Sequence, residues 1–363
     1  MPLAPLKQAA QQCHDGNKTP DEVRAAPATA KTPAPEAWKA DEKNARAMAA
    51  LEWRVIGETV PGASHIRAGI PNQDALLQLR ASSIALPIIL SVSDGHGSNK
   101  CFRSDRGSRF AVHLVGALLS ETLNEIYSGA HENVQDLAKF EEQAKNYLTV
   151  ELVKRWRSVV EADLAREPLQ ETEFARLIEK DGARARALVE ANPYLAYGAT
   201  LLAVALTSSF ALYMQLGDGE ILNVAAAGDV TQPLPEDARL LANETTSLCL
   251  PKAAEDFRFS VQALTNPPPA IILLTTDGYA NSFSTAAGFH QVGGDLISMM
   301  RADGFDAVNR SVKSWLEEAT QAGSGDDCTL ALIVRMNALE AHPSSTTVGG
   351  ADSHEQPASS KTA

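Results

Sequence analysis

The sequence predicts an α+β fold in which consecutive strands form an antiparallel meander and the helices lie apart from them. Short apolar runs rich in β-branched residues are typical of buried strands. Five such runs are Leu86–Val92, Thr200–Leu206, Phe210–Leu216, Ile271–Thr275 and Thr329–Val334. The apolar stretch 199–224 breaks at 207–209 and again at 217–219, which predicts consecutive hairpins. Strands and helices do not alternate regularly, so a doubly wound parallel sheet is not expected.

Two other regions have the residue spacing of helices. Apolar residues recur at helical intervals around Phe110 and Leu118, after the polar pair Ser104 and Asp105. Residues 132–190 are dense in Glu, Lys, Arg, Ala and Leu. Their apolar stripe contains Phe140, Tyr147, Leu152, Trp156, Val159 and Val160. We expect a helical insertion here; a solvated lobe is the simpler interpretation, and recruitment of a substrate or regulator is the alternative.

One folded domain is expected over residues 46–336, between two tails. Residues 1–45 and 337–363 lack apolar periodicity and cannot bury enough surface to offset the entropy of ordering, so we predict that both are disordered. The 363-residue chain has 45 acidic and 32 basic residues, a net charge of −13. Because the tails are nearly neutral, the acidic excess belongs to the folded domain.

Composition argues against several classes of protein. Nucleic acid is not expected as a partner, because no Lys/Arg-rich run is present to neutralise phosphates. No run approaches the roughly 20 apolar residues of a membrane-spanning helix, and the first residues lack the apolar core of a signal peptide. The four cysteines are scattered, without a CxxC pair. A reduced, cytoplasmic protein is the expectation.

Aspartates beside glycines at the ends of predicted strands are the main functional feature. Asp94 and Asp277 each directly follow an apolar strand and precede a glycine. The other members of the set are Asp74, Asp218, Asp326 and Asp327. A strand end holds a carboxylate rigidly, and an adjacent glycine lets a metal or phosphate approach the main chain. A single Asp–Gly pair is more often a simple turn, but the repeated pattern favours a site.

Gathered carboxylates repel one another unless a cation neutralises them. Oxygen-only donor sets select hard ions such as Mg²⁺ or Mn²⁺ over zinc or copper. Two such ions about 4 Å apart can share a bridging water, lower its pKa towards ~7 and stabilise an in-line displacement at phosphorus. The aspartates therefore predict a magnesium or manganese site for phosphate chemistry.

In their order along the chain, these residues resemble the motifs of the metal-dependent protein phosphatases of the protein phosphatase 2C family. The motifs are Asn72–Ala75, Asp94–Gly97, Gly198–Thr200, Gly217–Gly219, Thr276–Gly278 and Asp326–Thr329. The resemblance covers about residues 55–336. Ser64–His65 with Gly69, the stretch 97–107, and Asn243–Leu248 are similar to the bacterial branch.

The resemblance implies a four-layer α-β-β-α sandwich of two antiparallel sheets flanked by helices, with metals in a cleft at one edge. It implies that Asp94 bridges two metal ions and that the Gly95 carbonyl reaches one of them. Asp277 and Asp326 would complete the first metal site. A metal-bridging water or hydroxide would attack the phosphorus directly, without a phospho-enzyme.

It also implies roles around this pair of ions. Asp74 would bind or orient water at the second metal, and Asp218 with Asp277 would hold a third, looser ion. His96 would be the general acid that protonates the leaving Ser/Thr oxygen, a role worth roughly 10²–10⁴ in rate. The alternative for His96 is a solvent-exposed histidine in a turn.

Three positions depart from the family pattern. The acidic residue expected before Asp74 is Gln73, whose neutral oxygen binds a divalent ion more weakly, so the second metal could be loose. The Asn expected after the last ligand is Asp327, so either Asp326 or Asp327 could ligate. Gly69 stands where the family has an arginine that grips the phosphate. Arg67 is the predicted substitute, with His65 as the other neighbour.

The leading hypothesis is a Mg²⁺/Mn²⁺-dependent protein serine/threonine phosphatase in bacterial signalling. Its partners would be phosphorylated Ser/Thr proteins and a cognate Ser/Thr kinase system. The main alternative is a pseudophosphatase that uses the same fold as a binding or regulatory module, motivated by Gln73 and the missing arginine. A different phosphate enzyme is a third possibility, but no Gly-x₄-Gly-Lys-Ser/Thr loop is present.

Overall fold

Two five-stranded antiparallel sheets form the centre of the computed structural model, which describes residues 42–80, 86–128, 137–235, 246–264 and 267–340. The first sheet has the order β1-β10-β9-β6-β7, and the second has the order β2-β3-β4-β5-β8. The strands of the first are β1 (Trp53–Val60), β10 (Cys328–Arg335), β9 (Ile271–Thr275), β6 (Glu220–Val224) and β7 (Val230–Thr231). Those of the second are β2 (Ala75–Arg80), β3 (Ile88–Ser93), β4 (Leu201–Leu206), β5 (Phe210–Leu216) and β8 (Arg258–Ala263).

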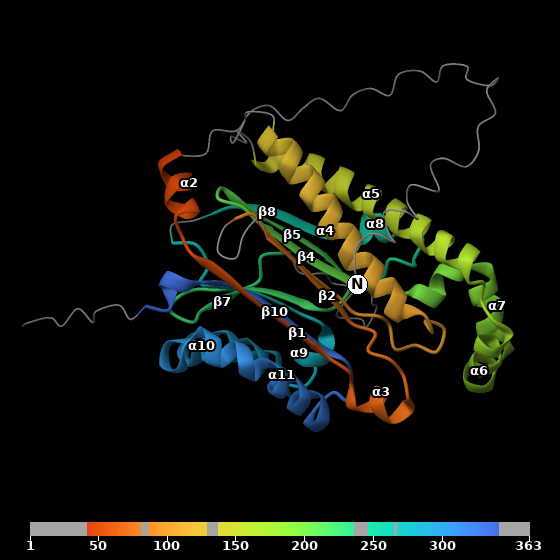
Figure 1. Cartoon of the computed structure of the whole chain (residues 1–363). Helices are drawn as coiled ribbons and strands as arrows, with labels where there is room; N and C mark the ends of the chain where they lie inside the picture. Colours follow the sequence, from red (N-terminus) through yellow and green to blue (C-terminus); the bar gives the residue numbers. More distant parts are fainter. Residues whose placement is uncertain (1–41, 81–85, 129–136, 236–245, 265–266, 341–363) are drawn as a thin grey trace, which may run out of the picture.

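Long helices cover the outer face of each sheet and complete four layers (Figure 1). The second sheet is covered by α4 (Ser104–Ser128) and α5 (Leu137–Arg166), and the first by α10 (Ala286–Asp303) and α11 (Phe305–Ala322). The shorter helices are α2 (Glu42–Ala49), α3 (Ala63–Ala68), α6 (Glu171–Asp181), α7 (Ala183–Ala191), α8 (Ala253–Asp256) and α9 (Asp277–Ala280), with 3₁₀ turns η1 (Pro193–Tyr197) and η3 (Met336–Ala338). The predicted α+β sandwich is confirmed.

Side chains of the central strands alternate between two cores, which explains why their sequences are apolar throughout. In β3, Leu90 faces the core between the sheets, whereas Ile89 packs with the α4–α5 layer. In β9, Leu274 faces the same central core, whereas Leu273 packs with the α10–α11 layer. Successive residues of a strand point to opposite faces, so a strand covered on both faces must be continuously apolar.

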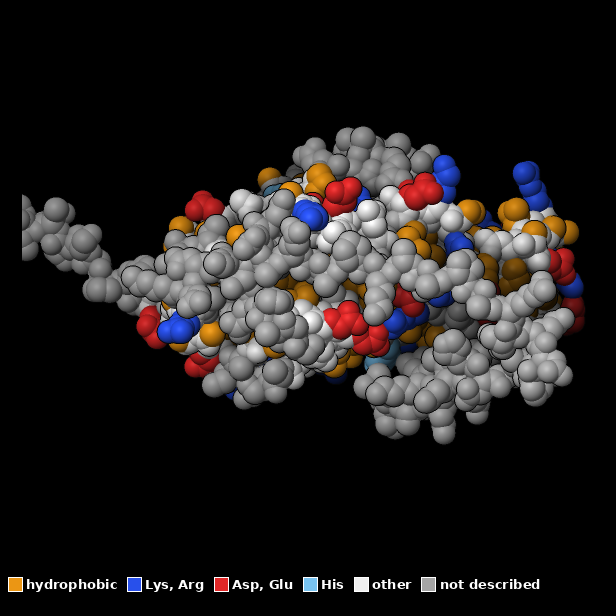
Figure 2. Space-filling model, turned by 90° about the horizontal axis from the view of Figure 1, so that it is seen from above, with side chains coloured by type: hydrophobic (Ala, Val, Ile, Leu, Met, Phe, Trp, Pro, Cys, Tyr) orange, Lys and Arg blue, Asp and Glu red, His pale blue; other side chains and the backbone are white. Residues whose placement is uncertain are grey.

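The predicted helical insertion consists of α5, α6 and α7, and we call α6, α7 and η1 the helical lobe. In Figure 1 this lobe lies at one end of α4 and α5. In Figure 2, acidic and basic side chains are interspersed over the described surface of the face seen from above. None of the helices among the described residues has the length and apolar composition needed to cross a membrane.

The predicted tails fall mainly outside the described residues. The described part of the chain begins at Glu42 and ends at Glu340. It therefore includes four residues of the predicted N-terminal tail, in α2, and four of the predicted C-terminal tail, which follow β10. Met48 of α2 is buried in the core between the sheets, which gives this helix an apolar contact with the domain.

Candidate metal centre and catalytic site

Strand register brings the predicted aspartates to one end of the sandwich. Ala75 pairs with Ser93, so Asp74, just before β2, and Asp94, just after β3, are neighbours. In the other sheet Thr275 pairs with both Glu220 and Leu330, so the segment after β9 lies beside the β5–β6 turn and the start of β10. The aspartates in these three segments are Asp218, Asp277, Asp326 and Asp327.

Three of these carboxylates form one compact group. Asp94, Asp218 and Asp277 each offer an oxygen, and the three oxygens lie within 4.8 Å of one another. Burial, followed by the charges of the neighbouring aspartates, raises the pKa of Asp94 well above its usual value. Burial and the charge of Asp218 raise the pKa of Asp277 to about 6. Negative charges held this close favour a bound cation, because the cation removes their mutual repulsion.

Asp74 lies beside this group, and only one of its two carboxylate oxygens is hydrogen-bonded within the described part of the chain. Its Oδ2 accepts hydrogen bonds from the hydroxyls of Thr276, at 2.8 Å, and Thr329, at 2.7 Å. Its Oδ1 is buried and has no hydrogen-bond partner among the described residues. The side chain is 7% exposed, and burial raises its pKa to about 7 in spite of the two hydroxyls. A buried carboxylate oxygen without a partner is suited to a metal ion or its water.

Asp326 and Asp327 have different surroundings in the structure. Asp327 is buried, and its carboxylate accepts the backbone N–H groups of Gly62, at 2.6 Å, and Gln73, at 2.7 Å. It therefore ties the loops before α3 and β2 to the start of β10. The Asp326 side chain is 47% exposed, and its charge contributes to the raised pKa of both Asp94 and Asp277. Of the two carboxylates, Asp326 is therefore the more exposed, and Asp327 is the one held by backbone donors.

His96 follows Asp94 in the loop after β3 and is half-buried beside Gly198. Its backbone N–H donates to the Gly198 carbonyl at 3.1 Å. A Cβ atom on residue 198 would lie 2.9 Å from the His96 ring, so only glycine leaves room for the imidazole. Burial lowers the pKa of His96, while the charge of Asp218 opposes this effect. The imidazole is thus predominantly neutral near pH 7 and must gain a proton before it can act as an acid.

Gly95 and Thr200 hold the ends of this loop together. Gly95 forms an isolated antiparallel bridge with Ala199, and the Thr200 N–H donates to the Asp94 carbonyl at 2.8 Å. The Thr200 hydroxyl accepts the Asp94 N–H at 3.0 Å. A Cβ on Gly95 would lie 2.6 Å from the Gln73 carbonyl oxygen, so glycine allows the two loops to approach closely.

Arg67, predicted to bind the substrate phosphate, is on the exposed side of α3. Within the described residues it makes no hydrogen bond or ion pair. His65 on the same helix is buried, with 8% of its surface exposed, and faces the acidic end of the sandwich. Helical spacing places residues two apart on different faces, which is why one of the pair faces the site and the other faces solvent.

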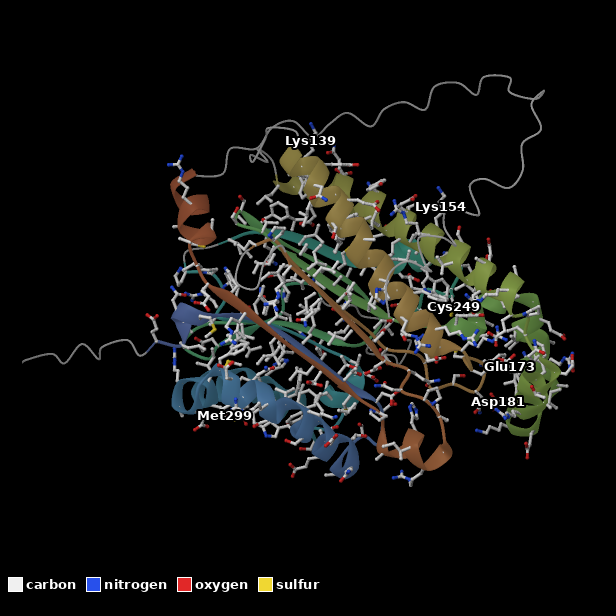
Figure 3. The ribbon with its side chains drawn as sticks, viewed as in Figure 1. Lys139, Lys154, Glu173, Asp181, Cys249 and Met299 are labelled. Atoms are coloured by element: carbon white, nitrogen blue, oxygen red, sulfur yellow. The ribbon has the colours of Figure 1, made fainter. Side chains whose placement is uncertain are left out.

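A buried arginine connects the loop after β3 to the helical lobe. Arg103 donates from Nε and Nη2 to the Glu173 carboxylate at 2.7 and 2.8 Å, and from Nη1 to the Tyr197 hydroxyl at 2.9 Å. It also donates to the carbonyls of Glu167 and Pro168. Figure 3 places Glu173 and Asp181 together in the lobe.

A second contact lies nearer to the loop, where Asn99 donates to Asp181 at 2.8 Å. Sequence reasoning missed both contacts, and it also assigned no role to the hydroxyls of Thr276 and Thr329. The sequence does place one Thr directly before Asp277 and another shortly after the Asp326–Asp327 pair. Only the structure shows that both hydroxyls reach Asp74.

Comparison with known proteins shows which family the sequence matches. The family model described as Protein phosphatase 2C matches residues 61–317. The Staphylococcus aureus serine/threonine phosphatase Stp1 is 14% identical with a TM-score of 0.48, over 78% of this chain and 94% of that one. The Mycobacterium tuberculosis serine/threonine phosphatase PstP is 16% identical with a TM-score of 0.43, over 78% and 99%. None of the curated proteins compared has a matching sequence. Because the family model spans most of the chain, the protein belongs to the protein phosphatase 2C family.

Proposed function

We propose that the protein is a Mg²⁺- or Mn²⁺-dependent phosphatase that hydrolyses phospho-Ser and phospho-Thr in proteins. The observation that carries this proposal is the group formed by Asp94, Asp218 and Asp277 beside His96. Family membership supports the reaction class. The substrates would come from a Ser/Thr kinase system, because such kinases form these phosphate esters.

The residues present fit divalent cations of the hard type. The aspartates supply only oxygen donors, the kind that Mg²⁺ and Mn²⁺ accept, and one oxygen of Asp74 is buried without a protein partner. We assign Asp94, Asp277 and Asp326 to one ion, with the Gly95 carbonyl, and Asp74 to the second. Asp218 and Asp277 would hold a third. When bound, such ions activate water for attack at phosphorus and stabilise charge on the phosphoryl oxygens.

The chain's own residues then organise the proton transfer. His96 is assigned to donate a proton to the leaving Ser or Thr oxygen. The Gly198 carbonyl fixes the His96 backbone, and the absence of a side chain at residue 198 leaves space for the ring. Because burial lowers the pKa of His96, the negative charge of a bound phosphate ester would favour the protonated ring that an acid requires.

The decisive experiment measures hydrolysis of a phospho-Thr peptide and of an aryl phosphate, with Mn²⁺ or with EDTA. Wild type should turn over both substrates only with metal, and Asp94→Asn should lose turnover on both. Asp303→Asn is the matched control, because Asp303 is exposed at the end of α10. The same chemical change there should leave activity intact.

A pseudophosphatase is the second candidate, favoured by Gln73 in place of an acidic residue. Gln73 is buried, and its side-chain oxygen has no hydrogen-bond partner among the described residues. If wild type binds Mn²⁺ in calorimetry but hydrolyses neither substrate, the enzyme proposal fails and the binding-module interpretation replaces it.

A further inference from the structure

His65 is a buried imidazole that faces the acidic end of the sandwich and has no role in the catalytic scheme above. It lies on α3, and 8% of its surface is exposed. Its ring is close to the loop of the proposed general acid, since Nε2 is 3.9 Å from the position of a Cβ on Gly97. It is also near two aspartates, Asp326 and Asp327, and the three side chains form a group whose donor atoms lie within 4.8 Å of one another.

Asp327 lies beside one nitrogen of this ring. Its Oδ2 lies 2.9 Å from His65 Nδ1, although the ring N–H is not aligned with that oxygen. The same carboxylate is held by the backbone N–H groups of Gly62 and Gln73, so it is not free to move. A carboxylate at Nδ1 favours a proton there, which leaves Nε2 with its lone pair. Metal-binding histidines typically have this arrangement, with a carboxylate at the nitrogen that does not bind the ion.

Nε2 points towards the carboxylate assigned to the metal centre. The distance from His65 Nε2 to Asp326 Oδ1 is 3.5 Å. Two donors each about 2.1 Å from one ion, at roughly a right angle, are about 3 Å apart. The observed spacing is therefore close to that of two ligands of a shared ion, and a small side-chain movement would complete it. Asp326 Oδ1 also accepts the Asp327 N–H at 2.8 Å, and 47% of the side chain is exposed, so the oxygen is held by the backbone while remaining open to an ion.

A further buried carboxylate, Asp74, directly follows Gln73, whose backbone N–H binds Asp327. Asp74 is 7% exposed, and its Oδ1 has no hydrogen-bond partner among the described residues. Its charge contributes to the raised pKa of His65. The same carboxylate also responds to the charges of Asp326 and Asp327. The Asp327 carboxylate thus contacts both the His65 ring and the backbone that leads into Asp74.

We propose that His65 is a metal ligand, with Nε2 joining Asp326 at the ion to which Asp326 is assigned above, and with Asp327 lying beside Nδ1. This inference rests on the metal dependence proposed above. Imidazole nitrogen is a ligand for transition-metal ions, whereas Mg²⁺ prefers oxygen donors, and Mn²⁺ is the transition-metal ion that also accepts the carboxylates of this site. With His65 as a ligand, the site would bind Mn²⁺ in preference to Mg²⁺.

The opposite arrangement is a protonated His65 that bridges the two aspartates as a built-in cation. A fixed positive charge would compete with a metal ion, so its removal would strengthen metal binding. The two arrangements therefore predict changes in affinity of opposite sign when the ring is removed.

The test uses His65→Asn, because the Asn amide can reach Asp327 as Nδ1 does but has nothing in place of Nε2. Calorimetric titration of the full chain with Mn²⁺ should show about 10- to 100-fold weaker binding at one site, with a smaller change for Mg²⁺. In wild type, pulsed EPR of bound Mn²⁺ should show coupling to a ¹⁴N nucleus, and His65→Asn should lose it. His290→Ala, on α10, is the control and should change neither readout.

Each other outcome has one meaning. Unchanged or stronger Mn²⁺ binding in His65→Asn, or wild type without ¹⁴N coupling, overturns the ligand assignment while the phosphatase proposal stands. No Mn²⁺ binding by wild type overturns the proposed metal centre itself. Thermal unfolding of each metal-free variant shows whether a loss of affinity comes from misfolding. If His65→Asn does not fold, His65→Gln provides the same comparison.

Discussion

Removal of the divalent cations should make the domain less stable as the pH rises, and Asp74 should be a main cause. Asp74 is buried, and its pKa is about 7 in the folded protein against an ordinary value of 3.8. Between these values the folded state keeps a proton that the unfolded state has released. The free energy of unfolding therefore falls as the pH rises from about 4 to about 7.

The size of the effect follows from the two pKa values. Each pH unit in this window is worth about 1.4 kcal/mol, so the whole window corresponds to about 4 kcal/mol and the part above pH 5 to about 3 kcal/mol. Below the lower pKa both states are protonated and the loss disappears. Asp277, with a pKa of about 6, adds a loss of the same sign up to that pH.

The assay is urea unfolding of the metal-free protein at pH 5 and pH 8, for wild type and for Asp74→Asn. The amide cannot ionise and can still accept hydrogen bonds from Thr276 and Thr329, so the variant should lose about 3 kcal/mol less than wild type across this interval. Saturating Mn²⁺ should suppress the pH dependence of wild type. If Asp74→Asn and wild type have the same slope, the ionisation of Asp74 does not limit stability and the reasoning is refuted.

Two further predictions concern His96 and the helical lobe. His96→Ala should reduce turnover roughly 10²–10⁴-fold on a phospho-Thr peptide but much less on an aryl phosphate, whose leaving group needs little protonation; equal losses would remove the general-acid assignment. Arg103→Lys should lower the free energy of unfolding by about 3 kcal/mol, because lysine cannot replace the bidentate contact of this buried arginine with Glu173, and it leaves a buried cation with fewer acceptors. Arg109→Lys, whose ion pair with Asp105 is at the surface, should cost less than about 1 kcal/mol in the same urea titration.

The sequence predicted the central strands well because local pattern determines them. Strands covered on both faces, such as β4 and β9, are apolar at every position. Edge strands were harder to predict: β1 contains Arg54 and Glu58 among its apolar residues, and β7 has two residues. In α5 the predicted stripe included Tyr147, which is 51% exposed, because a long helix at the edge of a core has a less regular apolar face.

The aspartates of the site were predictable for a similar reason. Each lies at the end of a strand or in a tight turn, where local sequence identifies it. The contacts of Asp327 were not predictable, because they join it to Gly62 and Gln73, more than 250 positions away in the chain. The positions of His65 and Arg67 depended on which side of a six-residue helix faces the domain. Only the tertiary packing of α3 decides that.

Gly95 and Ala199 pair with each other, so the hundred or so residues between them form an excursion from the sheet whose two ends are held together. The chain leaves the site after Asp94 and returns at Thr200, where the two backbones are hydrogen-bonded to each other. The helices α6 and α7, which pack on each other and on η1 rather than on the strands, can therefore vary in length without changing the distance between the strands that carry the carboxylates. The helical lobe and the strand ends that carry the carboxylates are thus mechanically separable.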